Sequence, residues 1–194
     1  MTTSKQLIVV AGPNGSGKTT FALEYLAERA YVYLSADAIA EGLSPDAPER
    51  KQFAAGRQFL AALEEGLASD ESLLVESTLS GRRFSRVLEA ARATGFSTSI
   101  VMLFLNSPET CVGRVQQRVR KGGHHVPEVD IRRRFSRSLY NFWSSYRFLA
   151  DHWALMYNAN GGFESVAAGT GKKVSTHNER LFDEFLVMAQ RNRQ

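Results

Sequence analysis

The sequence of 194 residues is poor in cysteine and proline, and it contains no long hydrophobic run. Its one cysteine, Cys111, has no intrachain partner for a disulfide and no second thiol with which to build a zinc site, which favours a reducing compartment. The longest apolar run near the N-terminus, Leu7 to Ala11, falls far short of the roughly 20 residues that a membrane span needs. We therefore expect a soluble, cytoplasmic protein that makes no membrane contact.

The excess of positive charge is small and local. Lysine and arginine number 24 and aspartate and glutamate 20, for a formal charge of +4, and the basic residues concentrate between Arg114 and Arg137. A local excess is typical of a segment that handles phosphate, so we do not expect nucleic acid as the partner. The length and the 43% apolar content predict a single domain over residues 1–194.

Short apolar runs alternate with segments of helical periodicity. Apolar runs typical of buried strands cover residues 7–10, 31–34, 72–76, 97–105 and 153–157. Helices are expected after the glycine-rich loop, after Leu34, from Pro45 and Pro48 to about Leu67, and over 82–94, 108–121 and 127–149. A peripheral hairpin is predicted over 166–174 and a last helix from about Asn178. This alternation predicts a doubly wound or three-layer α/β domain with a parallel sheet.

A phosphate-binding loop follows the first predicted strand. The pattern G-x-x-x-x-G-K-[ST] is met by the segment Gly12-Pro13-Asn14-Gly15-Ser16-Gly17-Lys18-Thr19. Its backbone N–H groups and the following helix, whose N-terminus carries about half a positive charge, suit a β-phosphate. Lys18 would reach the β and γ oxygens and Thr19 would hold Mg²⁺, whereas a simple flexible turn needs neither side chain at this spacing. Because the guanine motif Asn-Lys-x-Asp is absent, the expected cofactors are ATP and Mg²⁺.

Two acidic residues follow predicted strands. Asp37 and Glu76 come just after the second and third strands, at the edge where open parallel sheets place their ligands. Phosphoryl transfer requires a group that takes the proton of the acceptor hydroxyl, and Asp37 is the preferred general base; its alternative role is to cap the helix after Leu34. Glu76 is interpreted as a ligand of Mg²⁺ or of its water shell, as a substrate-binding residue, or as a solvated strand end.

A basic segment near residues 118–130 has the composition of a closing lid. Arg118 and Arg120 precede Gly122-Gly123, and either guanidinium could stabilise charge on the transferred phosphoryl group. Cations also favour helix C-termini for dipole reasons alone. The adjacent His124 and His125 are more typical of a loop than of a zinc site.

Two further groups of residues, a run of three arginines and a cluster of aromatic residues, could have structural rather than functional roles. On a helix, at most one or two of Arg132, Arg133 and Arg134 can face the site. The aromatic residues crowded between Tyr140 and Phe148 favour core packing over a platform for stacking bases.

Together these motifs resemble those of the zeta-toxin-like P-loop kinases, in particular their small stand-alone branch. The resemblance runs from about Leu7 to Asn160 and depends on four segments: 12–20, 35–40, 76–81 and 118–127. It implies an adenylate-kinase-like fold and transfer of the ATP γ-phosphate to a hydroxyl of a nucleotide-sugar, which is UDP-N-acetylglucosamine in the toxins. The base of that family falls on Asp37 and its acid after the third strand on Glu76. Thr20 would join the nucleotide-binding residues and Thr78 the substrate-binding ones.

The resemblance also implies a partner and leaves the acceptor open. A toxin of this family would be blocked by a small antitoxin protein. His124 stands where we align the second lid arginine of the toxins, so the acceptor could be another small hydroxyl compound. Two other classes remain as alternatives to a kinase: an ATP- or GTP-driven switch that acts on a protein partner, and an RNA-binding protein whose affinity would fall steeply with salt.

Overall fold

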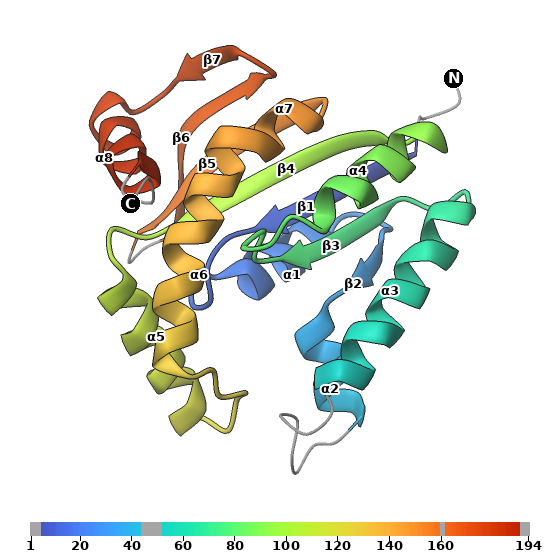
Figure 1. Cartoon of the computed structure of the whole chain (residues 1–194), viewed down its shortest axis with the longest axis horizontal. Coiled ribbons are helices and arrows are strands. Elements are labelled where there is room, and N and C mark those ends of the chain that lie inside the picture. The colour runs from blue at the N-terminus through green and yellow to red at the C-terminus, as the bar shows by residue number, and fades with distance from the viewer. Residues whose placement is uncertain (1–4, 44–51, 160–161, 191–194) are drawn as a thin grey trace.

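The chain folds around one mostly parallel β-sheet, with helices on both faces (Figure 1). This computed structural model describes residues 5–43, 52–159 and 162–190. Over these residues seven strands are ordered β2-β3-β1-β4-β5-β6-β7. Their bounds are β1 (Gln6–Ala11), β2 (Val32–Leu34), β3 (Leu73–Ser77), β4 (Ser97–Phe104), β5 (His152–Ala159), β6 (Gly162–Thr170) and β7 (Lys173–Thr176).

The helices follow the predicted alternation. They are α1 (Lys18–Leu26), α2 (Ala36–Leu43), α3 (Gln52–Ala68), α4 (Phe84–Ala93), α5 (Pro108–Arg120), α6 (Glu128–Asn141), a π-helical turn (Phe142–Tyr146), α7 (Arg147–Leu149) and α8 (Glu179–Gln190). Pro45 and Pro48, predicted to open the third helix, lie outside the described residues, and that helix is described from Gln52. Over the described residues, none of these helices combines the length and apolarity needed to cross a bilayer.

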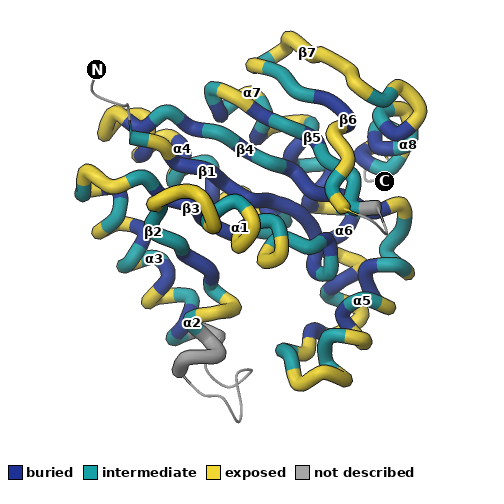
Figure 2. The backbone as a smooth tube through the Cα atoms, turned by 180° about the vertical axis from the view of Figure 1, so that it is seen from behind, coloured by how far each residue is buried: buried dark blue, intermediate teal, exposed yellow. Residues whose placement is uncertain are grey.

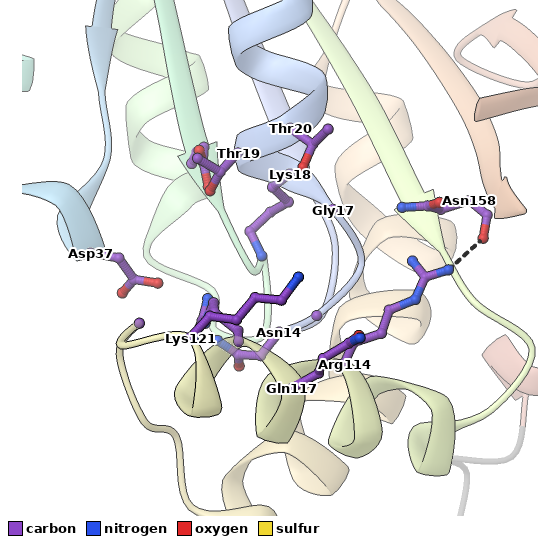
Figure 3. A pocket seen from close by; sticks show the side chains of 14 residues that line it. Asn14, Gly17, Lys18, Thr19, Thr20, Asp37, Arg114, Gln117, Lys121 and Asn158 are labelled. Atoms are coloured by element: carbon purple, nitrogen blue, oxygen red, sulfur yellow. Dashed lines mark hydrogen bonds between the residues drawn. The ribbon is translucent and has the colours of Figure 1, made fainter. Parts of the chain in front are cut away.

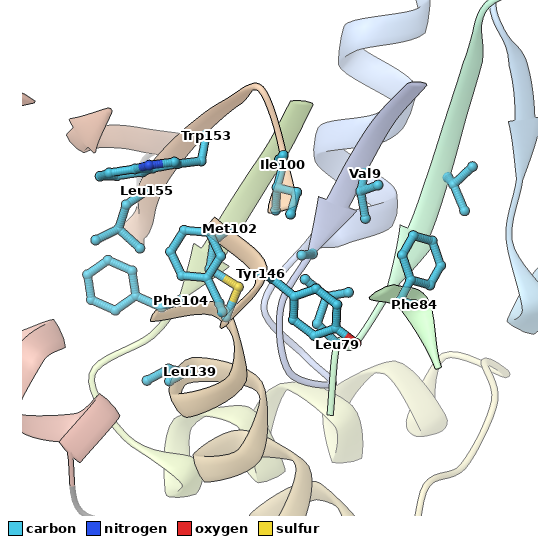
Figure 4. Close-up of a cluster of buried hydrophobic side chains, with 14 of the residues drawn as sticks. Val9, Leu79, Phe84, Ile100, Met102, Phe104, Leu139, Tyr146, Trp153 and Leu155 are labelled. Atoms are coloured by element: carbon cyan, nitrogen blue, oxygen red, sulfur yellow. The ribbon is translucent and has the colours of Figure 1, made fainter. Parts of the chain in front are cut away.

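The central strand β1 is buried on both faces. Leu7 and Val9 point to one face and Ile8 and Val10 to the other, because side chains alternate along a strand. The larger core lies between the sheet and α3, α4, α6 and α8, and Figure 4 shows part of it. The smaller core, on the opposite face, includes Ala22 of α1, which Figure 2 shows in front of the sheet. The three-layer α/β prediction is therefore confirmed.

The sheet is parallel only through β5. Strands β2, β3, β1, β4 and β5 pair in parallel, but β6 pairs antiparallel with β5, and β7 antiparallel with β6. The predicted hairpin therefore exists, but it extends the main sheet and begins at Gly162 rather than Val166. Its first residues are largely exposed, so they lack the continuous apolar run by which the buried strands were recognised.

The helix predicted over 127–149 is interrupted by the π-helical turn. There the N–H of Arg147 donates to the carbonyl of Phe142, five residues earlier. Phe142 and Tyr146 are buried, and Phe142 packs edge-on against Trp153, which confirms the core-packing interpretation for these two residues. Trp143 packs against the core while partly buried, whereas Phe148 is exposed and was wrongly included.

Candidate active site

The site lies where the parallel strands end. Strand β1 runs into the loop 12–17, β3 ends at Ser77 directly after Glu76, and Asp37 lies in the first turn of α2, which follows β2. Because β1, β2 and β3 are parallel, their carboxyl ends meet at one edge of the sheet. The three predicted segments are thus brought together as expected.

The phosphate loop is tightly packed and relies on glycine. Gly12 has φ 145°, and a β-carbon there would lie 2.4 Å from the carbonyl oxygen of Leu103. Gly17 has φ 93° and directly precedes α1, and a β-carbon there would lie 2.3 Å from Nδ2 of Asn158. That amide donates to the carbonyl of Ser16 at 2.8 Å, so Asn158 holds the loop from strand β5.

A cleft of about 480 Å³ opens in front of the loop (Figure 3). The side chains of Lys18, Asp37 and Lys121 project into the same space in Figure 3. Residues from the loop, from α1 and α2 and from α5 line this cleft: Asn14, Gly15, Gly17, Lys18, Thr19, Thr20, Asp37, Glu76, Arg114, Gln117, Arg118, Lys121, Gly123 and Asn158. Four of these side chains are cationic and two are acidic, so the cleft suits an anionic ligand.

Lys18 lies at the centre of this arrangement. Its Nζ donates to the carbonyl of Pro13 at 3.1 Å, within the loop itself. Burial lowers the pKa of Lys18, while the nearby carboxylates of Glu76 and Asp37 act in the opposite direction. An anionic ligand in the cleft would favour the charged ammonium further.

Glu76 is buried and held by two hydroxyls. Thr19 donates from Oγ1 to Oε2 of Glu76 at 3.2 Å, and the hydroxyl of Tyr33 donates to Oε1. Burial, followed by this bond to Glu76, raises the pKa of Tyr33, so the phenol stays a donor. With only 8% of its surface exposed, Glu76 is not a solvated strand end. Sequence reasoning missed Tyr33, although its place in the second strand put it near the site.

Asp37 is exposed and lies inside helix α2 rather than at its cap. The cap position belongs to Ser35, whose Oγ accepts from the N–H of Ala38 at 3.4 Å. The Asp37 carboxylate is therefore free of the capping role that the sequence allowed. It lines both the cleft and a second cavity.

The two predicted lid arginines lie on different faces of α5. Arg118 lines the cleft and donates to the carbonyl of His124 at 2.7 Å, whereas Arg120 lines a separate cavity beside Val126 and Ile131. Residues two apart on a helix differ by about 200°, so both could not face one ligand. The prediction that Arg120 stabilises the transferred phosphoryl group is therefore wrong, because Arg120 lies away from the phosphate loop. Arg114, one turn before Arg118, lines the cleft instead.

The second cavity, of about 310 Å³, adjoins the cleft. Both are lined by Asn14, Lys18, Asp37 and Glu76. The second is also lined by Ser35, Ala36, Phe59, Ser77, Thr78, Ser80, Phe84 and Arg134.

One arginine of the triple run reaches this cavity. Arg134 donates to Oδ1 of Asn14 at 3.2 Å, while Arg132 pairs with Glu109 and Glu128, and Arg133 with Asp130. This agrees with the expectation that at most one or two of the three face the site. Phe59 and Phe84 were not predicted as lining residues, since each belongs to the apolar face of a helix.

Known proteins share this fold. A curated relative, an uncharacterized protein of Haemophilus influenzae, is 27% identical over 128 residues, which cover 66% of this chain and 91% of that protein. The solved structure of AvrRxo1-ORF1:-ORF2 with ATP matches with a TM-score of 0.72 and 19% identity over 95% of this chain. This chain spans only 64% of the length of that protein.

A second solved structure has a comparable likeness. The PezAT chromosomal toxin-antitoxin system of Streptococcus pneumoniae matches with a TM-score of 0.69 and 13% identity, over 95% of this chain and 80% of that chain. These likenesses show a P-loop kinase-like α/β fold. The family model described as an AAA domain matches residues 7–137. The chain belongs to this AAA domain family.

Proposed function

We propose that this chain is an ATP-dependent kinase of the zeta-toxin-like group, which transfers the γ-phosphate of ATP to a hydroxyl of a small molecule. One observation carries the proposal: the cationic cleft at the phosphate loop adjoins the second cavity, and Lys18, Asp37 and Glu76 line both. A hydrolytic switch needs a nucleotide site alone. A kinase needs a second compartment that meets the first at the transferred phosphate.

In the proposed reaction the acceptor oxygen attacks the γ-phosphorus while the bond to the β,γ-bridging oxygen breaks. The proton of the acceptor hydroxyl passes to the carboxylate of Asp37, and ADP leaves. Lys18 exchanges its bond to Pro13 for the β and γ oxygens, and Arg118 from α5 neutralises charge on the phosphoryl group. Arg134 is suited to the same task from the acceptor side.

The residues at the base of the cleft fit Mg²⁺. The hydroxyl of Thr19 and the carboxylate of Glu76 are oxygen donors within hydrogen-bond distance of each other, the ligand type that this cation prefers. Mg²⁺ bound there would neutralise charge on the β- and γ-phosphates. Glu76 therefore serves the metal in this proposal, and Thr78 is the substrate-binding residue.

The lid and the acceptor complete the proposal. Residues 118–130 would close over the nucleotide, because the guanidinium of Arg118 is held by the carbonyl of His124 inside this same segment, and Gly122 with φ 87° follows the end of helix α5. A nucleotide-sugar such as UDP-N-acetylglucosamine suits the second cavity, which we take as the acceptor cavity because its lining combines hydroxyl residues (Ser35, Thr78 and Ser80) with two phenylalanines and Arg134. The whole chain would act as one kinase domain.

A protein partner also belongs to the proposal. The AvrRxo1 structure is described as a complex of ORF1 with ORF2, and PezAT is described as a toxin-antitoxin system. A small antitoxin that covers the cleft would be the corresponding partner of this chain.

A direct test incubates the protein with Mg·ATP and a panel of nucleotide-sugars, nucleosides and sugars. Release of ADP and the mass of the product are followed, with Lys18→Met as the control that excludes a contaminating kinase. The proposal expects an increase in acceptor mass by one phosphoryl group, absent in the control. ATP binding without phosphorylation of any acceptor would contradict it and favour the switch.

A further inference from the structure

The loop after β3 contains a residue in an unfavourable backbone conformation. Leu79 has φ 50°, in the left-handed region that residues other than glycine rarely adopt, and only 1% of its surface is exposed. Its neighbours Thr78 and Ser80 both line the acceptor-side cavity, and their hydroxyls lie 2.9 Å apart. The backbone conformation of Leu79 therefore places two residues of the cavity lining whose hydroxyls contact each other.

Two side chains far away in sequence hold this loop. Asn141 donates from Nδ2 to the carbonyl of Leu79 at 2.9 Å, and the hydroxyl of Tyr146 donates to the carbonyl of Gly81 at 2.6 Å. Within the loop, the N–H of Leu79 donates to Oγ of Ser77 at 3.1 Å. The conformation of the loop thus depends on contacts from outside it.

The π-helical turn makes both contacts possible. Asn141 directly precedes the turn and Tyr146 ends it, five positions later. In a regular α-helix, side chains five positions apart point about 140° away from each other. The wider turn, marked by the bond from the N–H of Arg147 to the carbonyl of Phe142, lets both side chains reach the same loop.

We propose that Asn141 and Tyr146 are positioning residues for the acceptor: from the two ends of the π-helical turn they hold residues 78–81 in the conformation that presents Thr78 and Ser80 to the acceptor cavity. This inference builds on the proposed kinase function. Neither residue lines the nucleotide cleft, so their effect is confined to the acceptor half of the site.

The test compares Tyr146→Phe with Tyr140→Phe, which removes a hydroxyl from the same helical segment, six positions earlier. Asn141→Ala provides a second variant in case Tyr146→Phe folds poorly. Two readouts are measured: hydrogen exchange of the amides of residues 78–83, and steady-state kinetics with UDP-N-acetylglucosamine or water as the acceptor of the ATP γ-phosphate.

For Tyr146→Phe we expect exchange in residues 78–83 to accelerate, and the KM for UDP-N-acetylglucosamine to rise, by about five- to tenfold each, the effect of one lost hydrogen bond. The KM for ATP and the slow hydrolysis of ATP by water should not change, and Tyr140→Phe should behave like the wild type. A merely structural role would instead lower transfer and hydrolysis in parallel.

Unchanged exchange in residues 78–83, or a parallel loss of both reactions, would overturn the positioning role. If the wild-type protein phosphorylates no acceptor, the proposed function is what fails. The exchange of residues 78–83 then decides by itself whether Asn141 and Tyr146 hold the loop.

Discussion

The candidate site has two halves that are built in different ways: the cleft at the phosphate loop, which is the nucleotide half, and the second cavity, which is the acceptor half. Six of the fourteen residues that line the nucleotide half come from one contiguous segment, 12–20, whose proposed contacts to phosphate depend on backbone N–H groups and on glycine conformations. Apart from Asn14 and Lys18 of the phosphate loop, the acceptor half is assembled from the ends of β2 and β3 and from α3, α4 and α6, which contribute one to four residues each. A contiguous motif can be read from its spacing, whereas an assembled cavity depends on how five elements pack.

This difference predicts different sensitivities to mutation. ATP binding in the nucleotide half should be lost when the backbone of the loop is disturbed. Acceptor binding should weaken when single lining side chains, or the side chains that hold them in place, are removed. Lys18, Asp37 and Glu76, which line both cavities, should matter to both halves.

The largest effect is expected for Lys18→Met. Loss of a cation that we propose contacts the transferred phosphate should lower kcat/KM about a thousandfold. The melting temperature should stay equal or rise, because burial lowers the pKa of Lys18 and so makes the charged form unfavourable in the folded protein. Turnover and thermal unfolding measured on one preparation check both results, and an unchanged rate would remove Lys18 from the mechanism.

The next largest effect, on stability and ATP affinity, is expected at a glycine of the phosphate loop but not at a glycine of the loop after β3. Gly12→Ala forces a β-carbon to 2.4 Å from the Leu103 carbonyl at φ 145°, and should cost about 2–4 kcal/mol of stability together with ATP affinity. Gly81→Ala, in the acceptor loop, meets nothing within 4 Å and should change stability by less than about 0.5 kcal/mol. Urea unfolding and ATP titration measure both. If Gly12→Ala keeps the stability and the ATP affinity of the wild type, the nucleotide half does not depend on its backbone conformation as we expect.

The smallest effect lies outside both halves, at the start of β4 and β5. Asp151 accepts from the N–H and the hydroxyl of Thr98 at 2.8 Å each. Burial by itself would raise the pKa of Asp151, but these bonds and Arg92 outweigh it and hold that pKa below its ordinary value. Its stabilisation is therefore present above the unfolded pKa, about 3.9, and is lost as pH falls through the folded value.

Asp151→Asn should accordingly cost about 1–2 kcal/mol at pH 7 and progressively less below about pH 4, without changing turnover. Denaturant unfolding at a series of pH values measures this. A cost that does not depend on pH would show that the carboxylate charge contributes nothing.

The contrast between the halves also explains what the sequence could predict. The loop, its strand and its helix were recognisable because the pattern fixes backbone and side chains together. Asp37 and Glu76 could be placed because parallel strands end at one edge of the sheet. These predictions needed only local order and one rule of topology.

The remaining features depend on packing. Arg118 and Arg120 are equivalent by composition, and only the orientation of α5 decides that Arg118 faces the cleft. Tyr33 was hidden in a strand, and Arg134 in a run of three arginines. The π-helical turn leaves no pattern in the sequence, because its extra residue is stabilised by tertiary contacts such as the bond from Tyr146 to Gly81.

In the proposed mechanism, the two halves of the site meet at Asp37 and cooperate in phosphoryl transfer. The most direct test measures ATP affinity and acceptor-dependent turnover side by side in the wild type and in Asp37→Asn. For Asp37→Asn we expect equal or slightly tighter ATP binding, because a negative charge near the phosphates is removed, and a fall in kcat of about 10²- to 10⁴-fold from loss of the general base. Unchanged turnover, or a loss of activity explained entirely by weaker ATP binding, would contradict it.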